Sequence, residues 1–172
     1  MVLEINVLNI NDHRPTFNPT NTQVSVAEDA VPGTSVAKFS LTDYDLSPYG
    51  TPRGWVRRTE TNNAHEYFQL VHVYGVIWQL EVQSALDRDT MTTNPIVFRV
   101  LTVDLGSSYG SATVTVTITN VNDNRPTFSP SFYSWEVDYN ATEQTSVGTV
   151  TATDGDIGKY NIPVPKLGAM VL

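Results

Sequence analysis

Residues 120–130 read NVNDNRPTFSP, and residues 9–19 read NINDHRPTFNP, which is identical at eight of the eleven positions. The two segments begin 111 residues apart (120 − 9 = 111), and the same offset relates Thr42-Asp43 to Thr153-Asp154 without a gap. One register kept over this length indicates an internal repeat, which is the signature of a tandem array of similar domains. The fold must therefore be one that the chain can build repeatedly in series.

The repeat period divides the chain into five parts. The alternating threonine and apolar residues of 113–119 predict a strand with one buried face, and 111 residues earlier the apolar positions hold Leu3, Ile5 and Val7. We therefore expect residues 1–8 to be the last strand of a preceding repeat, 9–15 a linker, 16–119 a complete repeat, 120–126 a second linker, and 127–172 the truncated start of a following repeat.

Seven short strands are predicted within the complete repeat, because apolar and polar residues alternate and Pro and Gly punctuate the gaps. They span Asn21–Ala27, Ser35–Leu41, Trp55–Arg58, Tyr67–Val73, Val76–Val82, Ile96–Val103 and Ser111–Thr119. No helical periodicity competes with this pattern, and Tyr74-Gly75 has the composition of a hairpin turn. Short strands at this spacing predict an all-β fold, a β-sandwich.

The composition excludes several classes of protein. Acidic residues outnumber basic ones 18 to 10, and the resulting net charge of −8 argues against nucleic-acid binding. The one basic cluster, Arg53, Arg57 and Arg58, is interpreted as a solvated loop. The absence of cysteine excludes disulfides, zinc–thiolate sites and cysteine nucleophiles. No apolar stretch is long enough to span a bilayer and the N-terminus lacks a basic start, so neither a transmembrane segment nor a signal peptide is expected in this chain.

Ten of the 18 acidic residues fall in recurring contexts near the ends of predicted strands. They are Asp12 and Asp123 in the linkers, Glu28 in VAED, Asp43, Asp45, Asp154 and Asp156 in two TDxD motifs, Asp87 and Asp89 in LDRD, and Asp104 in VDLG. Alternate connections of a sandwich gather at one end, so these carboxylates can converge. Clustered carboxylates cannot all stay ionised unless a cation lies among them, and hard oxygen ligands suit Ca²⁺.

These motifs together resemble the extracellular repeats of the cadherin family. The resemblance is carried by VAED with AVPGTSV, TDYD, LDRD, VDLG and VNDNRPTF, and it covers essentially the whole chain. It implies a seven-strand Greek-key β-sandwich of immunoglobulin-like architecture, in an internal fragment of a larger cadherin or protocadherin-like protein. It further implies a calcium-dependent cell–cell adhesion module that is not an enzyme, in which Ca²⁺ at the junctions between repeats stiffens the extracellular array.

The resemblance also assigns the metal ligands. The junction at 120–124 would use Glu28, Asp87 and Asp89 from the repeat before it, Asn120, the Val121 carbonyl, Asn122, Asp123 and the Asn124 carbonyl from the linker, and Asp154 and Asp156 from the repeat after it. The junction at 9–13 would use Asn11, Asp12, the His13 carbonyl, Asp43, Asp45 and Asp104.

Three features depart from the family pattern. Asn9 and Asn120 stand where the family usually has Asp, so each junction loses one negative charge. Asp89 replaces the more usual Glu and has a shorter reach. Tyr139 occupies the position that matches Glu28, so a following junction would lack that bridging carboxylate.

Partners, location and modification follow from the same resemblance. It implies other cadherin ectodomains as partners, homophilic or heterophilic, with no nucleic acid and no small-molecule substrate. The parent protein is expected to be membrane-anchored, with these repeats on the extracellular side of the plasma membrane. Asn140 begins the one sequon without proline and is a candidate N-glycosylation site. Tryptic cleavage is expected to be fastest at Lys159 and Lys166, because the truncated repeat offers too few strands for independent stability.

Two alternative functions stay open. Residues 106–110 match the hydrolase pattern G-x-S-x-G, but a Thr/Val strand follows them where that motif requires a helix, so a hairpin loop is the better interpretation. A metal-independent tandem β-sandwich, acting as a spacer or receptor ectodomain module, would also explain the repeats. Calcium titration separates this second alternative, because a metal-free module shows no Ca²⁺-linked change in melting temperature.

Overall fold

The computed structural model describes residues 1–57, 63–143 and 145–158, and the chain divides into two units, Met1–Thr119 and Asn120–Leu172. Arg58, the last residue of one predicted strand, and the predicted cleavage sites Lys159 and Lys166 lie outside the described residues.

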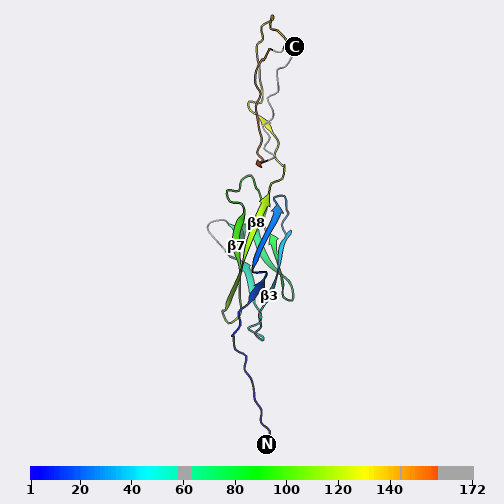
Figure 1. The fold of residues 1–172 in the computed structure, drawn as a ribbon. Coiled ribbons are helices and arrows are strands. Elements are labelled where there is room, and N and C mark those ends of the chain that lie inside the picture. Colours follow the sequence, from blue (N-terminus) through cyan, green and yellow to red (C-terminus); the bar gives the residue numbers. More distant parts are fainter. Residues whose placement is uncertain (58–62, 144, 159–172) are drawn as a thin grey trace. The chain divides into compact units, whose positions relative to one another are not determined.

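The first unit is a sandwich of two four-stranded sheets (Figure 1). One sheet has the order β1 (Thr16–Asn18), β3 (Ser35–Thr42), β6 (Ile77–Val82) and β5 (Phe68–Tyr74). The other has the order β2 (Asn21–Ala27), β8 (Tyr109–Thr119), β7 (Ile96–Val103) and β4 (Arg53–Val56). Strand β2 runs parallel to β8, and the other pairs of this unit are antiparallel. The predicted all-β sandwich is confirmed.

Three local features of the first unit differ from the predicted strands. Strand β1 precedes the first predicted strand and pairs with the opposite sheet, so the chain changes sheets at Pro19, between β1 and β2. Three residues are too few for an alternating pattern to be seen in the sequence. One helical turn, α1 (Ala64–Tyr67), precedes β5 and displaces its start from the predicted Tyr67 to Phe68; it is too short to show a helical period in the sequence.

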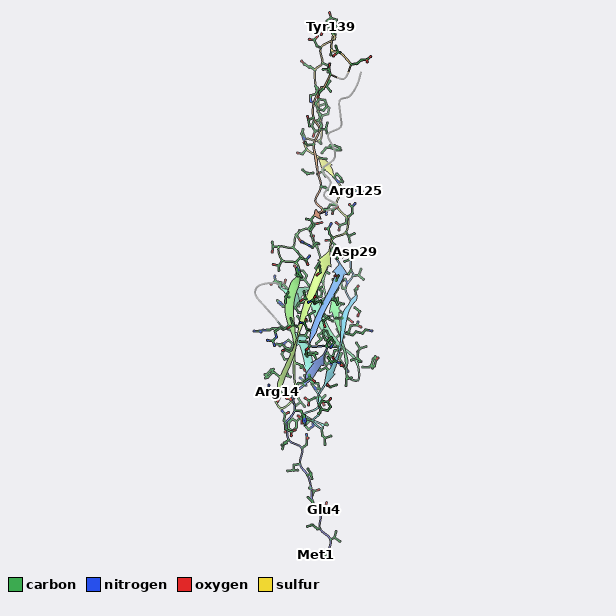
Figure 2. All side chains as sticks on the ribbon, viewed as in Figure 1. Met1, Glu4, Arg14, Asp29, Arg125 and Tyr139 are labelled. Carbon is green, nitrogen blue, oxygen red and sulfur yellow. The ribbon has the colours of Figure 1, made fainter. Side chains whose placement is uncertain are left out.

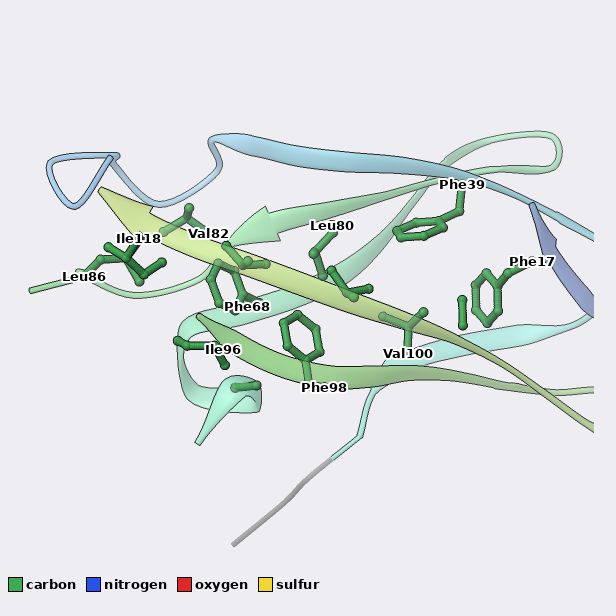
Figure 3. Close-up of a cluster of buried hydrophobic side chains, with 14 of the residues drawn as sticks. Phe17, Phe39, Phe68, Leu80, Val82, Leu86, Ile96, Phe98, Val100 and Ile118 are labelled. Carbon is green, nitrogen blue, oxygen red and sulfur yellow. The ribbon is translucent and has the colours of Figure 1, made fainter. Parts of the chain in front are cut away.

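The core lies between the two sheets and follows the period-two pattern of the sequence (Figure 3). Along β8, Val114, Val116 and Ile118 are buried while the intervening threonines are not. Phe68 and Phe98 stack in this core with ring centroids 5.5 Å apart. Each fully buried apolar side chain contributes about 1.5–3 kcal/mol, so this core holds the loops at both ends of the sandwich in place.

The described part of the second unit contains one antiparallel strand pair, β9 (Thr127–Phe128) and β10 (Ala152–Thr153). Its register pairs Phe128 with Ala152, and the first unit pairs Phe17 with Leu41, each 111 residues earlier. The sequence repeat is therefore also a repeat of backbone pairing. The hydrogen bonds of the two threonine pairs, Thr16 with Thr42 and Thr127 with Thr153, agree with this correspondence.

The N-terminal segment before the sandwich is exposed and includes Met1 and Glu4 (Figure 2). None of the described residues 1–10 belongs to a strand. The expectation that residues 1–8 are the last strand of a preceding repeat stays a prediction.

Candidate functional site

Acidic loops gather at the two ends of the first sandwich, which Figure 2 marks by the positions of Arg14 and Asp29. At one end, the residues that follow β3 and β7 meet the linker, and we call this group the Asp45 cluster. It comprises Asn11, Asp12, His13, Asp43, Asp45 and Asp104. At the other end, the residues that follow β2 and β6 form the Glu28 cluster, which comprises Glu28, Asp87 and Asp89.

The Asp45 cluster concentrates negative charge in a largely buried position. Asp43, Asp45 and Asp104 each place a carboxylate oxygen within 4.8 Å of the others. Asp45 and Asp104 are only 8% and 5% exposed. The Asp45 backbone N–H donates to Asp43 Oδ1 at 3.1 Å, which fixes the TDxD turn. Like charges this close and this buried are unfavourable without a cation or a proton.

Asn11 inserts its amide between two of these carboxylates. In one orientation, its nitrogen donates to Asp45 Oδ2 at 2.8 Å and to Asp104 Oδ2 at 3.0 Å. In the opposite orientation, the amide oxygen faces the same two carboxylates, and Nδ2 donates to Asp104 Oδ1 at 3.3 Å and to Ser108 Oγ at 3.4 Å. A cation makes the second orientation favourable, because it converts three facing acceptors into ligands. The amide therefore suits both the metal-free and the metal-bound cluster.

Two residues that the sequence analysis did not assign to the site support Asn11. A Cβ at Gly106 would overlap the Asn11 side chain, so glycine is required for the close approach. The Ser108 backbone N–H donates to Asp104 Oδ1 at 2.9 Å and orients that carboxylate. Gly106 is the last residue of the VDLG motif and Ser108 follows it, but residues 106–110 were interpreted only as a hairpin loop. The structure confirms this loop between β7 and β8.

His13 covers the exposed side of the Asp45 cluster. Its backbone N–H donates to Asp45 Oδ2 at 3.2 Å, and its Nδ1 lies 3.1 Å from Asp45 Oδ1 and 2.9 Å from Asp12 Oδ1. The hydrogen bond with Asp45 raises the pKa of His13, against the opposing effect of burial. Burial raises the pKa of Asp45, but hydrogen bonds from His13 and Asp12 outweigh it and hold that pKa below its usual value.

The Glu28 cluster is more open. The three carboxylates have oxygens within 4.8 Å of one another, but only Glu28 is buried. The Arg88 backbone N–H donates to Glu28 Oε2, and the Asp89 backbone N–H donates to Asp87 Oδ1 at 3.1 Å. LDRD is therefore a turn that presents two carboxylates on the same side as Glu28.

The second unit repeats the Asp45 cluster at the 111-residue offset, in a group we call the Asp156 cluster: Asp123, Asn124, Asp154 and Asp156. The Asn124 backbone N–H and Nδ2 donate to Asp156 Oδ1 at 3.2 and 2.9 Å. The Asp156 backbone N–H donates to Asp154 Oδ1 at 3.0 Å. The hydrogen bonds from Asn124 hold the pKa of Asp156 below its usual value, although burial opposes this effect. Asn124 thus takes the place of His13.

The predicted ligands of the 120–124 linker differ in burial and in hydrogen bonding. Asn120 donates from Nδ2 to the Ile157 carbonyl at 3.2 Å, as Asn9 does to the Leu46 carbonyl at 3.0 Å. Val121 is half-buried, and Asn122 is exposed. Asn122, which matches Asn11 at the repeat offset, is thus more exposed than the half-buried Asn11.

Some buried oxygen atoms in these groups have no hydrogen-bond partner. They allow a test of whether the groups fit a metal ion. Within the described residues, Asp43 Oδ2, Asp156 Oδ2 and Asn120 Oδ1 are buried and have no hydrogen-bond partner. A buried acceptor left unpaired costs about 1–3 kcal/mol, and more when it is charged. All three are hard oxygens, which Ca²⁺ binds in sets of six to eight. The donor set therefore fits calcium.

The predicted glycosylation site lies away from these clusters in the second unit's sequence. Asn140 is exposed, and the neighbouring Ala141 backbone N–H donates to the Asp138 carbonyl at 3.0 Å, which forms a turn. An exposed turn is accessible to a modifying enzyme, and glycosylation itself stays a prediction.

The chain is similar to cadherins over most of its length. It is 36% identical over 168 residues to protocadherin Fat 4 from Mus musculus, covering 93% of this chain and 3% of the relative. It is 31% identical over 158 residues to the cadherin EGF LAG seven-pass G-type receptor fmi-1 from Caenorhabditis elegans, covering 91% and 6%. Protocadherin alpha-10 from Mus musculus is 35% identical over 152 residues, covering 88% and 15%. The chain thus spans a small part of each of these curated relatives.

Solved structures of cadherin repeats resemble the fold. Mouse Cadherin-23 EC22-24 matches with a TM-score of 0.69 and 27% identity, covering 89% of this chain and 47% of that one. The protocadherin gammaB7 EC3-6 cis-dimer structure matches with a TM-score of 0.72 and 27% identity, covering 88% and 34%. No family model matches the chain. None of the described residues forms a helix with the length and hydrophobicity of a membrane span.

Proposed function

Because this chain belongs to the cadherin family and is built from its extracellular repeats, we propose that it is a calcium-dependent cell–cell adhesion module whose inter-repeat junctions are stiffened by Ca²⁺. The single observation that carries the proposal is the set of buried, converging oxygens in the Asp45 cluster, with the Asn11 amide between two carboxylates. A solvent-exposed acidic turn would need no such burial.

At an inter-repeat junction, the residues that would hold Ca²⁺ come from the preceding repeat, the linker and the following repeat. At 9–13 the ligands in this chain are Asn11, Asp12, the His13 carbonyl, Asp43, Asp45 and Asp104. At 120–124 they are Glu28, Asp87, Asp89, Asn120, the Val121 carbonyl, Asn122, Asp123, the Asn124 carbonyl, Asp154 and Asp156. When bound, Ca²⁺ supplies positive charge that neutralises these carboxylates and ties their loops together.

Charge explains why the junction would stiffen. Without metal, the carboxylates assigned to the two sides of the short linker would repel one another, and a pair of like charges about 4 Å apart costs on the order of 1–4 kcal/mol at effective dielectrics of 80 to 20. The repeats then separate and sample many angles. Shared ligation removes this repulsion and restricts the angle, which lets force pass along an extended array. We assign Asp123 to two sites, so its loss should have the largest effect at its junction.

Small-angle scattering tests the mechanism on a chain extended by one whole repeat, with the maximum dimension measured in Ca²⁺ and in chelator. We expect a longer maximum dimension in Ca²⁺, and Asp123→Ala should abolish the difference. Asp29→Ala is the matched control, because Asp29 is an exposed carboxylate beside the Glu28 cluster that belongs to no ligand set. Superimposable wild-type profiles would contradict the stiffening mechanism and favour the metal-independent spacer.

Partners and location belong to the same proposal. The partners are other cadherin ectodomains, in homophilic or heterophilic contacts, and nucleic acids and small-molecule substrates have no role. The parent protein is anchored in the membrane, with these repeats on the extracellular side of the plasma membrane. The relatives are cadherins and protocadherins rather than enzymes, which supports a non-enzymatic role.

A further inference from the structure

Arginine side chains gather on the outer face of the sheet that contains β4 and β7. Arg53 is the first residue of β4 and Arg57 directly follows that strand, so these two residues lie on a sheet and not in the solvated loop that the sequence suggested. Arg58, the third residue of that basic cluster, lies outside the described residues. The exposed Arg99 on β7 joins them. We call this surface the arginine face: Arg53, Trp55, Arg57 and Arg99.

The strand register places two of these arginines opposite each other. Val56 of β4 pairs with Val100 of β7. One position further along, the Arg57 backbone N–H donates to the Arg99 carbonyl at 2.9 Å, so the two arginines are cross-strand neighbours. Val100 is fully buried, and alternation along the strands therefore directs both arginines outward. Like charges in directly opposed positions are destabilising, so this pair favours an anion bound over it.

No described carboxylate neutralises the arginine face. None of the residues of β2, β4, β7 and β8 is acidic, although the chain has 18 acidic residues. Arg53, Arg57 and Arg99 form no ion pair with any described residue, and Arg99 instead donates to Ser111 Oγ on β8. In a chain with a net charge of −8, a local surface with three arginines and no acidic residue is complementary to an anionic partner.

A pocket beside the arginine face indicates which kind of anion fits. Trp55 lies between the two arginines of its strand, is 38% exposed, and lines a pocket of about 230 Å³. His65, Gln69 and Gln83 also line this pocket, and His65 Nδ1 is buried without a hydrogen-bond partner among the described residues. Amide groups and an imidazole nitrogen suit sugar hydroxyls, and the indole face suits the apolar side of a sugar ring. Glu66 Oε1 lies 4.0 Å from His65 Nε2, which makes this pocket unfavourable for a second anion.

We propose that the arginine face binds a sulfated polysaccharide, with sulfates over the three arginines and an uncharged part of a sugar ring beside Trp55. The guanidinium group donates two parallel hydrogen bonds to anionic oxygens. Four residues of strand separate Arg53 from Arg57 by about 13 Å, so a polymer with several anionic groups reaches both, whereas a single small anion does not. An acidic peptide would supply carboxylates but no ring hydroxyls for the pocket.

The proposal goes beyond the calcium function, because no residue of the arginine face is an assigned metal ligand. It uses the extracellular location proposed above, since sulfated polysaccharides are extracellular polymers. The test is made in chelator, so its outcome does not depend on whether the acidic clusters bind Ca²⁺.

Calorimetric titration of heparin into the 172-residue chain tests the proposal. Affinity should fall about 20–40-fold between about 50 and 200 mM salt, as counterion release at three charges predicts. Arg99→Gln should weaken binding about tenfold at the lower salt concentration and reduce the slope of log affinity against log salt by about one. Lys38→Gln is the matched control, because it removes the same charge from an exposed position on β3, in the opposite sheet. It should leave the affinity within about twofold.

Two further measurements separate a polysaccharide from other anions. Trp55→Leu should weaken heparin binding about fivefold without changing the salt slope, because it removes the ring contact and no charge. Poly-glutamate of equal charge should bind at least tenfold more weakly than heparin, a difference of about 1.4 kcal/mol. Absence of heparin binding at low salt, equal effects of Arg99→Gln and Lys38→Gln, or unchanged affinity of Trp55→Leu would each overturn the proposal. Poly-glutamate binding as tight as that of heparin would overturn it in favour of an acidic protein segment.

Discussion

Replacing Asp104 with Asn should raise the stability of the metal-free protein and lower its affinity for Ca²⁺. The side chain keeps its shape, and its Oδ1 can still accept from the Ser108 backbone N–H, now at 2.9 Å. The substitution removes one unit of charge from among carboxylate oxygens that lie within 4.8 Å of one another, and it also replaces Oδ2, which accepts from Asn11, with an amide nitrogen. A like-charge pair at that distance costs about 1–3.5 kcal/mol at effective dielectrics of 80 to 20.

The magnitudes follow from this charge. In chelator, relief of repulsion with Asp43 and Asp45 should raise the melting temperature by several degrees, since about 1 kcal/mol shifts a domain of this size by about 4–8 °C. In calorimetric Ca²⁺ titration, loss of a carboxylate ligand should raise the dissociation constant of the Asp45 cluster at least tenfold, which corresponds to about 1.4 kcal/mol.

Asp29→Asn is the control for Asp104→Asn, because it removes the same charge from an exposed position at the other end of the sandwich. It should change neither quantity appreciably. A lower melting temperature of Asp104→Asn in chelator would contradict the prediction, because relief of repulsion would then contribute less than the lost hydrogen bond from Asn11 to Asp104 Oδ2. An unchanged Ca²⁺ affinity would remove Asp104 from the ligand set and with it the assignment of the cluster.

Three further predictions concern residues around these sites. Gly106→Ala should displace the Asn11 side chain and weaken Ca²⁺ binding at 9–13 about tenfold by calorimetry, while the Glu28 cluster keeps its affinity; equal losses at both ends would indicate a global effect. In chelator, the raised pKa of His13 means that its stabilisation is complete below the unfolded pKa of about 6.5 and is lost as pH rises through the folded pKa. The melting temperature should therefore fall as pH rises from the unfolded to the folded pKa of His13, and His13→Gln should reduce this fall. A wild-type melting temperature that does not fall over this pH range would contradict the contact with Asp45. Protein expressed through a secretory pathway should lose mass on amidase treatment, and Asn140→Gln should remove that shift; an unglycosylated wild type would contradict the assignment.

Much of the fold and the acidic residues of the site were predictable, because their signals are local or periodic. Alternation along β7 and β8 needs only neighbouring residues, and it marked the buried face correctly. The 111-residue repeat identified equivalent positions without any structure, and the hydrogen bonds of His13 and Asn124 to their aspartates agree with it. The type of ligand followed from chemistry, since carboxylate and amide oxygens are hard.

What the tertiary structure decided was which distant residues meet. Asp104 joins Asp43 only because β7 and β3, in opposite sheets, end at the same end of the sandwich, and no pattern within either segment contains that information. The same convergence places Gly106 beneath Asn11 and Ser108 beside Asp104, so the residues that orient the ligands were not recognisable as part of the site. Strand β1 crosses to the other sheet because pairing with β3 buries Phe17, a gain that depends on the assembled core rather than on three residues of sequence. Periodicity thus determines which face of a strand is buried, whereas burial against partners distant in sequence determines which loops become one site.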